Sequence, residues 1–222
     1  RRVSFYNALY SRKKGQKRPG YPDRIRHVRF TALEAKGDER RICTHILWEM
    51  DWDTPVLDEF REVRVKALGE GEYFMDIVFK LQASYGDVDF LSDAVHYAWP
   101  YIRVNKAYNV DNGGRIVNSE GRINQKGTNG KVARWVDYSK MIEGSAEGIA
   151  IFSHPANPYP HRWLTRDYGC FGPRRPDSMS GKPFSLKKGQ TLTQRVGVLV
   201  HKGDVRGGKV AERYRLYCEG KL

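Results

Sequence analysis

Residues 152–169, FSHPANPYPHRWLTRDYG, hold the densest group of side chains in the chain that could do chemistry. The imidazoles of His154 and His161 can move protons near neutral pH. The guanidinium of Arg166 can neutralise a carboxylate or a sulfate, and the phenol of Tyr168 can serve as an acid or a base. We therefore predict that these four side chains are the catalytic residues of an enzyme active site.

A second group of residues is predicted to bind the substrate. Trp163, Tyr159 and Trp135 could form a flat apolar platform on which sugar rings stack, an extension of ordinary aromatic packing. Asn157 follows a strand and could face the same ligand as the histidines. Arg103 lies inside an apolar strand, where an inward guanidinium needs an anionic partner or ligand.

The loop in this stretch is stiffened by Pro155, Pro158 and Pro160, and an apolar strand over residues 148–152 leads straight into it. A stiff loop loses little entropy when it holds a ligand, which favours a binding site. The alternative is a rigid corner in which His and Asn side chains tie down backbone groups, as buried polar groups must. The sequence leaves both interpretations open.

Other familiar signatures are absent. The motifs GxGxxG, HExxH and GxSxG and the phosphate-binding loop do not occur. The histidines show no metal-ligand spacing beyond the weak pair His154 and His161, so we expect no metal and no cofactor. The paired carboxylates of a glycosidase meet in space rather than in sequence. Asp137, Glu147 and Asp167 are the carboxylates nearest to the cluster.

Strands must position these side chains, because apolar residues alternate with a period close to two over most of the chain. Turns rich in Gly and Asn separate the strands, and residues 118–120 (Asn-Ser-Glu) fit a turn at a strand end. No segment longer than ten residues keeps a helical period. The pattern predicts an all-β, antiparallel β-sandwich, jelly-roll or supersandwich-like, with little helix. The expected strands are 25–33, 41–52, 60–68, 73–83, 99–104, 113–118, 133–138, 147–153, 193–201 and 208–218.

Charge divides the chain into a basic N-terminal arm, residues 1–23, and one β-sandwich domain, residues 24–222. The 39 Lys and Arg against 26 Asp and Glu give a formal charge of +13, which attracts anions. Nucleic acid is an unfavoured partner because no RNA- or DNA-binding motif accompanies the charge. An acidic oligosaccharide or polysaccharide fits better.

The sequence says less about membrane association, disulfide bonds and oligomeric state. No run of 18 apolar residues occurs, so no membrane span is expected. The three cysteines are widely spaced, which argues against a zinc site or a disulfide framework but leaves one bridge open. The oligomeric state is open as well.

Three ordered motifs carry a resemblance to a known family. The segments RWVDYS (134–139), GIAIFSHPANP (148–158) and WLTRDYG (163–169) resemble the PmoA-like family of bacterial proteins. The resemblance covers about residues 24–217. It implies a β-sandwich protein, often associated with carbohydrate degradation, in the periplasm or outside the cell. The name derives from methane oxygenase, but the chain lacks the spanning helices and metal ligands that such an enzyme needs.

The resemblance also bears on the site. It implies that His154, Asn157, Trp163, Arg166 and Tyr168 are characteristic positions, and Arg103 less so. Only one face of the following strand can line a pocket together with His154. The resemblance favours the face that carries Arg166 and Tyr168 over the face that carries His161 and Trp163. Family members carry an earlier His-rich segment that is not in this sequence. Two explanations are open: the chain begins downstream of that segment, or the protein lacks it.

Two function hypotheses follow. The first is an enzyme, a polysaccharide or glycoside lyase that acts on an acidic glycan. Arg166 or Arg103 would hold the sugar carboxylate, and His154, His161 or Tyr168 would take the α-proton; hydrolysis by the nearby carboxylates is the second reaction of this class. The other hypothesis is a non-catalytic carbohydrate-binding β-sandwich.

Overall fold

The computed structural model describes residues 23–90, 98–158, 160–174 and 184–222. Antiparallel strands make up most of the described chain, and helix is limited to two α-helices and short 3-10 turns. The prediction of an all-β, sandwich-like fold is therefore confirmed. The predicted basic arm lies almost wholly outside the described residues.

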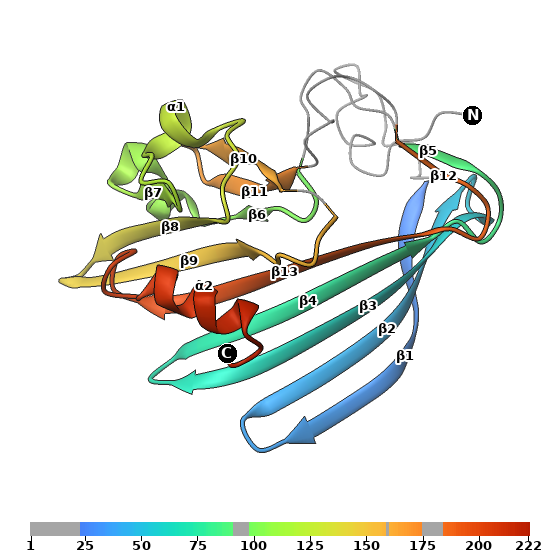
Figure 1. Ribbon diagram of the computed structural model, residues 1–222, viewed down its shortest axis with the longest axis horizontal. Coiled ribbons are helices and arrows are strands. Elements are labelled where there is room, and N and C mark those ends of the chain that lie inside the picture. The colour runs from blue at the N-terminus through green and yellow to red at the C-terminus, as the bar shows by residue number, and fades with distance from the viewer. Residues whose placement is uncertain (1–22, 91–97, 159, 175–183) are drawn as a thin grey trace, which may run out of the picture.

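The main layer is a sheet of eight antiparallel strands among the described residues, in the order β1-β2-β3-β4-β13-β9-β8-β7 (Figure 1). The strands are β1 (Arg24–Lys36), β2 (Glu39–Met50), β3 (Thr54–Gly69), β4 (Glu72–Gln82), β7 (Arg115–Asn118), β8 (Trp135–Ile142), β9 (Ser145–Ser153) and β13 (Thr191–Lys202).

Smaller elements cover parts of this sheet. A three-stranded sheet, β10 (Arg162–Arg166), β11 (Cys170–Arg174) and β6 (Ile102–Arg103), lies over the end formed by β7, β8 and β9 (Figure 1). The pair β5 (Val88–Phe90) and β12 (Phe184–Leu186) lies at the opposite end. The short helix α1 (Asn124–Thr128) follows β7, and 3-10 turns span Lys106–Tyr108 and Val110–Asn112.

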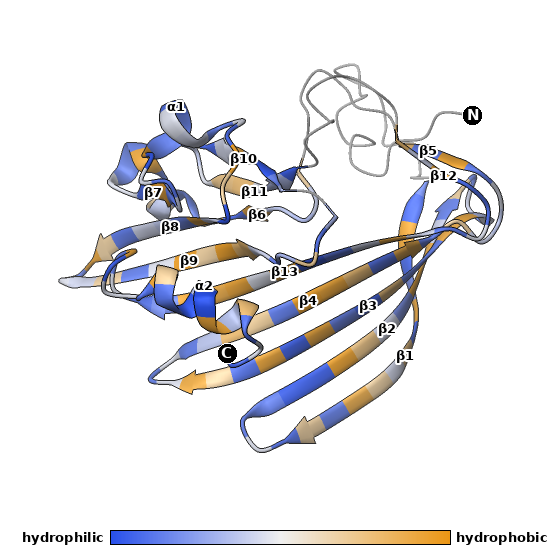
Figure 2. Ribbon diagram, viewed as in Figure 1, coloured by the Kyte–Doolittle hydropathy of each residue, from blue (hydrophilic) through white to orange (hydrophobic). Residues whose placement is uncertain are grey.

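The sandwich core lies between the large sheet and the three-stranded sheet. Trp163 and Phe171 from the small sheet contact Val136, Tyr138 and Ile151 from the large one, and all five side chains are fully buried. Each such side chain gains roughly 1.5–3 kcal/mol by leaving water, so this core fixes β10 against β8 and β9. Orange bands along β8, β9 and β13 mark these apolar rows in Figure 2.

On the other face of the large sheet, helix α2 (Val210–Cys218) packs over β4, β9 and β13; this segment was predicted wrongly as a strand over residues 208–218. The helix places Val210, Tyr214 and Tyr217 on one side, at i, i+4 and i+7, and they pack with Phe74 and Phe152. The charged residues between these positions hid the helical period, because the segment has few apolar residues with which to display it.

Candidate functional site

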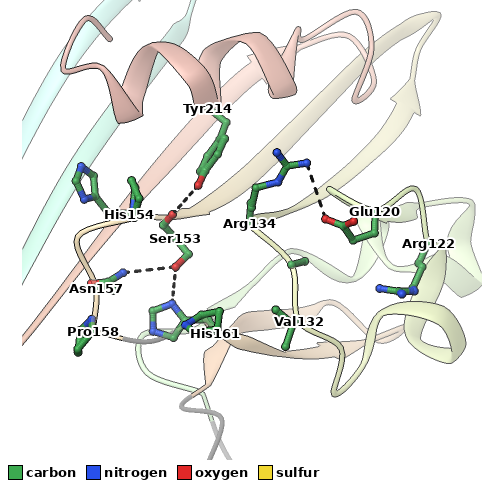
Figure 3. Close-up of a pocket in the computed structure, with 13 residues that line it drawn as sticks. Glu120, Arg122, Val132, Arg134, Ser153, His154, Asn157, Pro158, His161 and Tyr214 are labelled. Atoms are coloured by element: carbon green, nitrogen blue, oxygen red, sulfur yellow. Dashed lines mark hydrogen bonds and ion pairs between the residues drawn. The ribbon is translucent and has the colours of Figure 1, made fainter.

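An open pocket of about 750 Å³ lies where β9 ends and the proline-rich loop begins (Figure 3). One wall is the loop itself, the second is the segment before β8, and the third is helix α2. The pocket is lined by Glu120, Arg122, Val132, Ala133, Arg134, Ser153, His154, Pro155, Asn157, Pro158, Pro160, His161 and Tyr214.

Asn157 holds the loop in place. Its side-chain Nδ2 donates to the carbonyl of Arg195 at 2.8 Å, and its Oδ1 accepts from the amide of Arg195 at 2.8 Å. Its own amide donates to the carbonyl of His154 at 3.1 Å. The side chain thus pairs with strand β13 as another strand would, which is what the corner interpretation predicts.

His154 has one ring nitrogen engaged by the loop. Its Nδ1 accepts from the amide of Ala156 at 3.0 Å, and its ring lies edge-on to Tyr217, with the centroids 5.0 Å apart. Burial, together with the positive charge of Arg195, lowers the pKa of His154, so the imidazole is neutral at neutral pH. Because Nδ1 is the acceptor, the proton sits on Nε2. His154 is therefore a hydrogen-bond donor in this state and is unsuited to the predicted role of base.

His161 and Ser153 form a close pair in the pocket. The His161 Nδ1 and Ser153 Oγ atoms are 2.6 Å apart, and the two side chains are almost completely buried. Tyr214 closes this side by donating to the carbonyl of Ser153 at 3.3 Å. Burial and the hydrogen bond to Cys218 raise the pKa of Tyr214, which keeps its hydroxyl protonated. A hydroxyl and an imidazole at this distance can pass a proton between them.

Two arginines bring positive charge to the pocket. Arg134 and Arg122 line it together with a single carboxylate, Glu120. The Arg134 guanidinium and the Glu120 carboxylate are 3.9 Å apart, and both side chains are well exposed. Ser119 joins them, because its Oγ donates to the Glu120 carboxylate at 2.8 Å and accepts from the Arg134 amide at 2.9 Å. The predicted turn at residues 118–120 is present and carries this group.

Arg166 and Tyr168 do not line the pocket. Arg166 donates to Asn129 Oδ1 at 2.8 Å, and Tyr168 is 51% exposed with the Arg103 guanidinium 5.5 Å from its ring centroid. Arg103 is exposed rather than inward, contrary to the prediction. The row favoured by the resemblance is therefore the wrong one, since His161 shares the pocket with His154.

The two predicted stacking residues that the structure describes are core residues. Trp163 has no exposed surface, and its indole nitrogen donates to the carbonyl of Ala133 at 2.8 Å. Trp135 is 7% exposed and packs in the cluster under α2. Neither offers a face to a sugar ring, so this part of the prediction is wrong. Tyr159 lies outside the described residues.

The three candidate carboxylates also lie away from the pocket. Asp137 is fully buried and bonds to His201 Nε2 at 2.7 Å and to Ser139 Oγ at 2.8 Å. Glu147 accepts from the Tyr108 hydroxyl at 2.7 Å, and Asp167 accepts from the Gln125 amide at 2.8 Å. The described lining holds one carboxylate, Glu120, where a glycosidase of the two-carboxylate type needs a pair.

Sequence reasoning missed Ser153, Arg122, Arg134 and Tyr214. Ser153 could have been found, because it directly precedes His154 at the end of an apolar strand. Arg134 precedes β8, which pairs with β9, and the Ser153 amide donates to the Arg134 carbonyl at 2.8 Å. Only the strand pairing brings these residues together.

No group of three or more His, Cys, Asp or Glu side chains among the described residues could hold a metal ion. No helix in that part of the chain is long and apolar enough to cross a membrane. Cys43, Cys170 and Cys218 are free thiols.

The fold and the pocket define an all-β sandwich protein with an open, partly cationic site. The chain belongs to DUF6807, a family of unknown function, whose profile matches residues 2–215. No curated protein matches the chain. The PmoA-like resemblance stays a prediction.

Two solved structures are distantly similar. A putative kojibiose phosphorylase from the human microbiome is 10% identical, with a TM-score of 0.34, over 82% of this chain and 20% of its own. The GH36 α-galactosidase AgaA from Geobacillus stearothermophilus, in complex with raffinose, is 13% identical, with a TM-score of 0.35, over 84% of this chain and 28% of its own. The chain thus spans less than a third of either protein. Similarity at this level leaves the function to be argued from the site.

Proposed function

We propose that this protein is a carbohydrate-active protein that binds an acidic sugar in the pocket beside Ser153, and that it acts on this sugar as a lyase. One observation carries the proposal: the pocket joins two guanidinium groups, Arg122 and Arg134, to the Ser153–His161 pair. The arrangement differs from the predicted one in its cations, which come from the segment before β8 and not from β10 or β6.

The residues divide the work as an elimination requires. Arg134 and Arg122 bind the sugar carboxylate and stabilise the negative charge that develops on it when the neighbouring carbon loses its proton. The bond between the neighbouring carbon and its hydrogen breaks, and the proton passes to His161, which is hydrogen-bonded to Ser153. The electron pair forms a double bond to the next carbon, whose bond to the glycosidic oxygen breaks, and that oxygen takes a proton from the solvent in the open pocket. His154 Nε2 supplies a hydrogen-bond donor to a sugar oxygen, and the Tyr214 oxygen, whose proton is donated to the Ser153 carbonyl, can accept from a sugar hydroxyl. Hydrolysis fits less well, because Glu120 has no partner carboxylate among the described lining residues.

Binding without chemistry is the second candidate, and the behaviour of the loop favours it. The side chain of Asn157 is hydrogen-bonded to the backbone of Arg195, and the Nδ1 of His154 is hydrogen-bonded to the backbone amide of Ala156. Such a corner can present a binding pocket while contributing no catalytic group. Under either candidate an acidic glycan is the ligand, and we propose a periplasmic or extracellular location, where such polymers are met.

The test compares two pocket variants with a control. Oligogalacturonate is the acidic ligand and a malto-oligosaccharide is the neutral one, with binding followed by calorimetry and elimination by the ultraviolet absorbance of the unsaturated product. Arg134→Gln should weaken binding of the acidic ligand about tenfold, as loss of a charge-assisted hydrogen bond does. Arg166→Gln removes the same charge outside the pocket and should leave binding unchanged.

Ser153→Ala separates the two candidates. If the protein is a lyase, this variant should bind oligogalacturonate but form the unsaturated product at least about a hundredfold more slowly. If the parent binds the ligand and forms no product, the binding-only candidate stands. Equal affinity for the acidic and neutral ligands, or equal effects of the two Arg substitutions, would refute the proposal.

A further inference from the structure

The segment that forms the cationic wall of the pocket continues beyond it. Residues 119–134 carry four cationic side chains, Arg122, Lys126, Lys131 and Arg134, and all four are exposed. The same segment has one carboxylate, Glu120. We call these four cations the basic ridge. Arg122 and Arg134 line the pocket, whereas Lys126 and Lys131 do not.

The ridge has few internal counter-charges. Apart from the 3.9 Å contact of Arg134 with Glu120, its members form no ion pair within the described part of the chain. Like charges held on one short segment repel each other, and an anion that binds across them relieves that repulsion. A free positive surface of this kind therefore favours a ligand that carries several negative charges.

The backbone under the ridge is fixed. Asn118 Oδ1 accepts from the amides of Glu120 and Arg122 at 3.1 and 3.0 Å. The Gln125 amide donates to Asp167, and the carbonyl of Lys131 accepts from the Trp163 amide at 3.1 Å. The segment is thus fastened to β7 and β10, so a ligand does not have to order it on binding.

Apolar side chains lie between the cations. Ile123 is 43% exposed and Val132 is 41% exposed, and Val132 reaches the pocket (Figure 3). A sugar polymer offers apolar C–H faces between its charged groups, which such side chains can contact. The segment contains no aromatic residue, so it lacks the stacking platforms with which proteins bind single-stranded nucleic acid.

We infer that the basic ridge is an extended binding surface for an acidic polysaccharide chain, with the pocket as one of several subsites. The inference rests on the proposed function and adds that the ligand is a polymer rather than a single acidic sugar. The part of the polymer outside the pocket lies along Lys126 and Lys131.

The experiment measures binding of galacturonate, polygalacturonate and neutral dextran to the whole chain. Polygalacturonate should bind at least about tenfold more tightly per chain than galacturonate, because several subsites act together. Lys126→Gln combined with Lys131→Gln should weaken polymer binding about two- to twenty-fivefold and leave galacturonate binding unchanged, since exposed ion pairs contribute a factor of roughly 1.5 to 5 each. Lys36→Gln combined with Lys80→Gln removes the same charge from exposed positions on β1 and β4 and is the matched control.

The outcomes separate this inference from the proposed function. If galacturonate binds and depends on Arg134, but the two double variants weaken polymer binding equally, the extended surface is wrong and the pocket stands. If galacturonate does not bind the parent, the proposed function fails. Duplex DNA that binds as tightly as polygalacturonate, with the same dependence on Lys126 and Lys131, would overturn the inference in favour of a nucleic-acid surface.

Discussion

Removing the carboxylate of Asp137 should destabilise the fold without acting directly on the pocket. Asp137 and His201 have no exposed side-chain surface and are 2.7 Å apart. Ser139 donates to the second carboxylate oxygen. Gly148 and Gly208 pack so closely on the His201 ring that a Cβ at either position would overlap it. Asp137→Ala therefore leaves a buried imidazole with no carboxylate and no room to rotate.

The size of the effect follows from burial. Breaking a buried ion pair by removing one partner costs about 3–5 kcal/mol. For a chain of this size each kcal/mol lowers Tm by about 2–4 °C, so Tm should fall by roughly 6–20 °C. Asp137→Asn keeps the shape and one acceptor and should cost less. Ser139→Ala removes one hydrogen bond to the carboxylate and should cost about 1.5–3 kcal/mol.

The pH dependence gives an independent check. Burial lowers the pKa of His201, but the hydrogen bond and charge of Asp137 outweigh it and the pKa is raised; burial also raises the pKa of Asp137. The folded chain thus holds a proton on this pair more tightly than the unfolded chain does. The resulting stability is present below about pH 6.5 and is lost as pH rises through the folded pKa.

In Asp137→Asn the imidazole stays buried without its charge partner, so burial lowers its pKa and the sign reverses. The stability difference between parent and variant should therefore shrink as the pH rises above about 6.5. Urea unfolding at a series of pH values measures it. An unchanged unfolding free energy, together with loss of turnover in Asp137→Asn, would refute the structural role and restore Asp137 as a catalytic carboxylate.

Three further predictions concern the corner, the core and the pocket. Asn157→Ala removes both hydrogen bonds to the Arg195 backbone and should lower the unfolding free energy by about 1–3 kcal/mol, measured by urea denaturation; no change would mean that the loop does not depend on them. Trp163→Ala should cost about 3–5 kcal/mol, as for a core residue, whereas a stacking residue would lose ligand affinity at constant Tm. Glu120→Gln should raise the affinity for galacturonate about two- to fivefold in calorimetry, because it frees Arg134 from a competing carboxylate; weaker binding would show that Glu120 contacts the ligand.

Several strands could be predicted from the sequence because apolar residues recur along them with a period close to two. In β4, Ile77 and Phe79 pack in the sandwich core, whereas Asp76 and Lys80 have the opposite strand parity. Helix α2 could not be predicted in this way, since only Val210, Tyr214 and Tyr217 face the sheet. A nine-residue helix with so few apolar positions leaves no periodic signal.

Only some of the pocket residues could be predicted from the sequence. His154, Asn157 and His161 line the pocket and lie close to one another in the sequence, so the composition of that one stretch revealed them. Arg122 and Arg134 enter from the segment between β7 and β8 and reach the pocket only because β8 pairs with β9. Local sequence does not encode that pairing. Residue type alone assigned to Arg166 the anion-binding role that we propose for Arg134, which lines the pocket.

The loop residues 153–158 and residues 160–161 form both a corner and a wall of the pocket, and their hydrogen bonds show which side chains serve each purpose. The side chain of Asn157 is hydrogen-bonded to the Arg195 backbone, and His154 Nδ1 accepts a hydrogen bond from the Ala156 amide. These bonds fix the loop, and the fixed loop holds the His161–Ser153 pair and the His154 ring at the rim of one cavity. A site built in this way needs its scaffold bonds to keep its geometry, so substitutions at Asn157 should disturb ligand binding through the loop, while substitutions at Arg134 should act on the ligand alone.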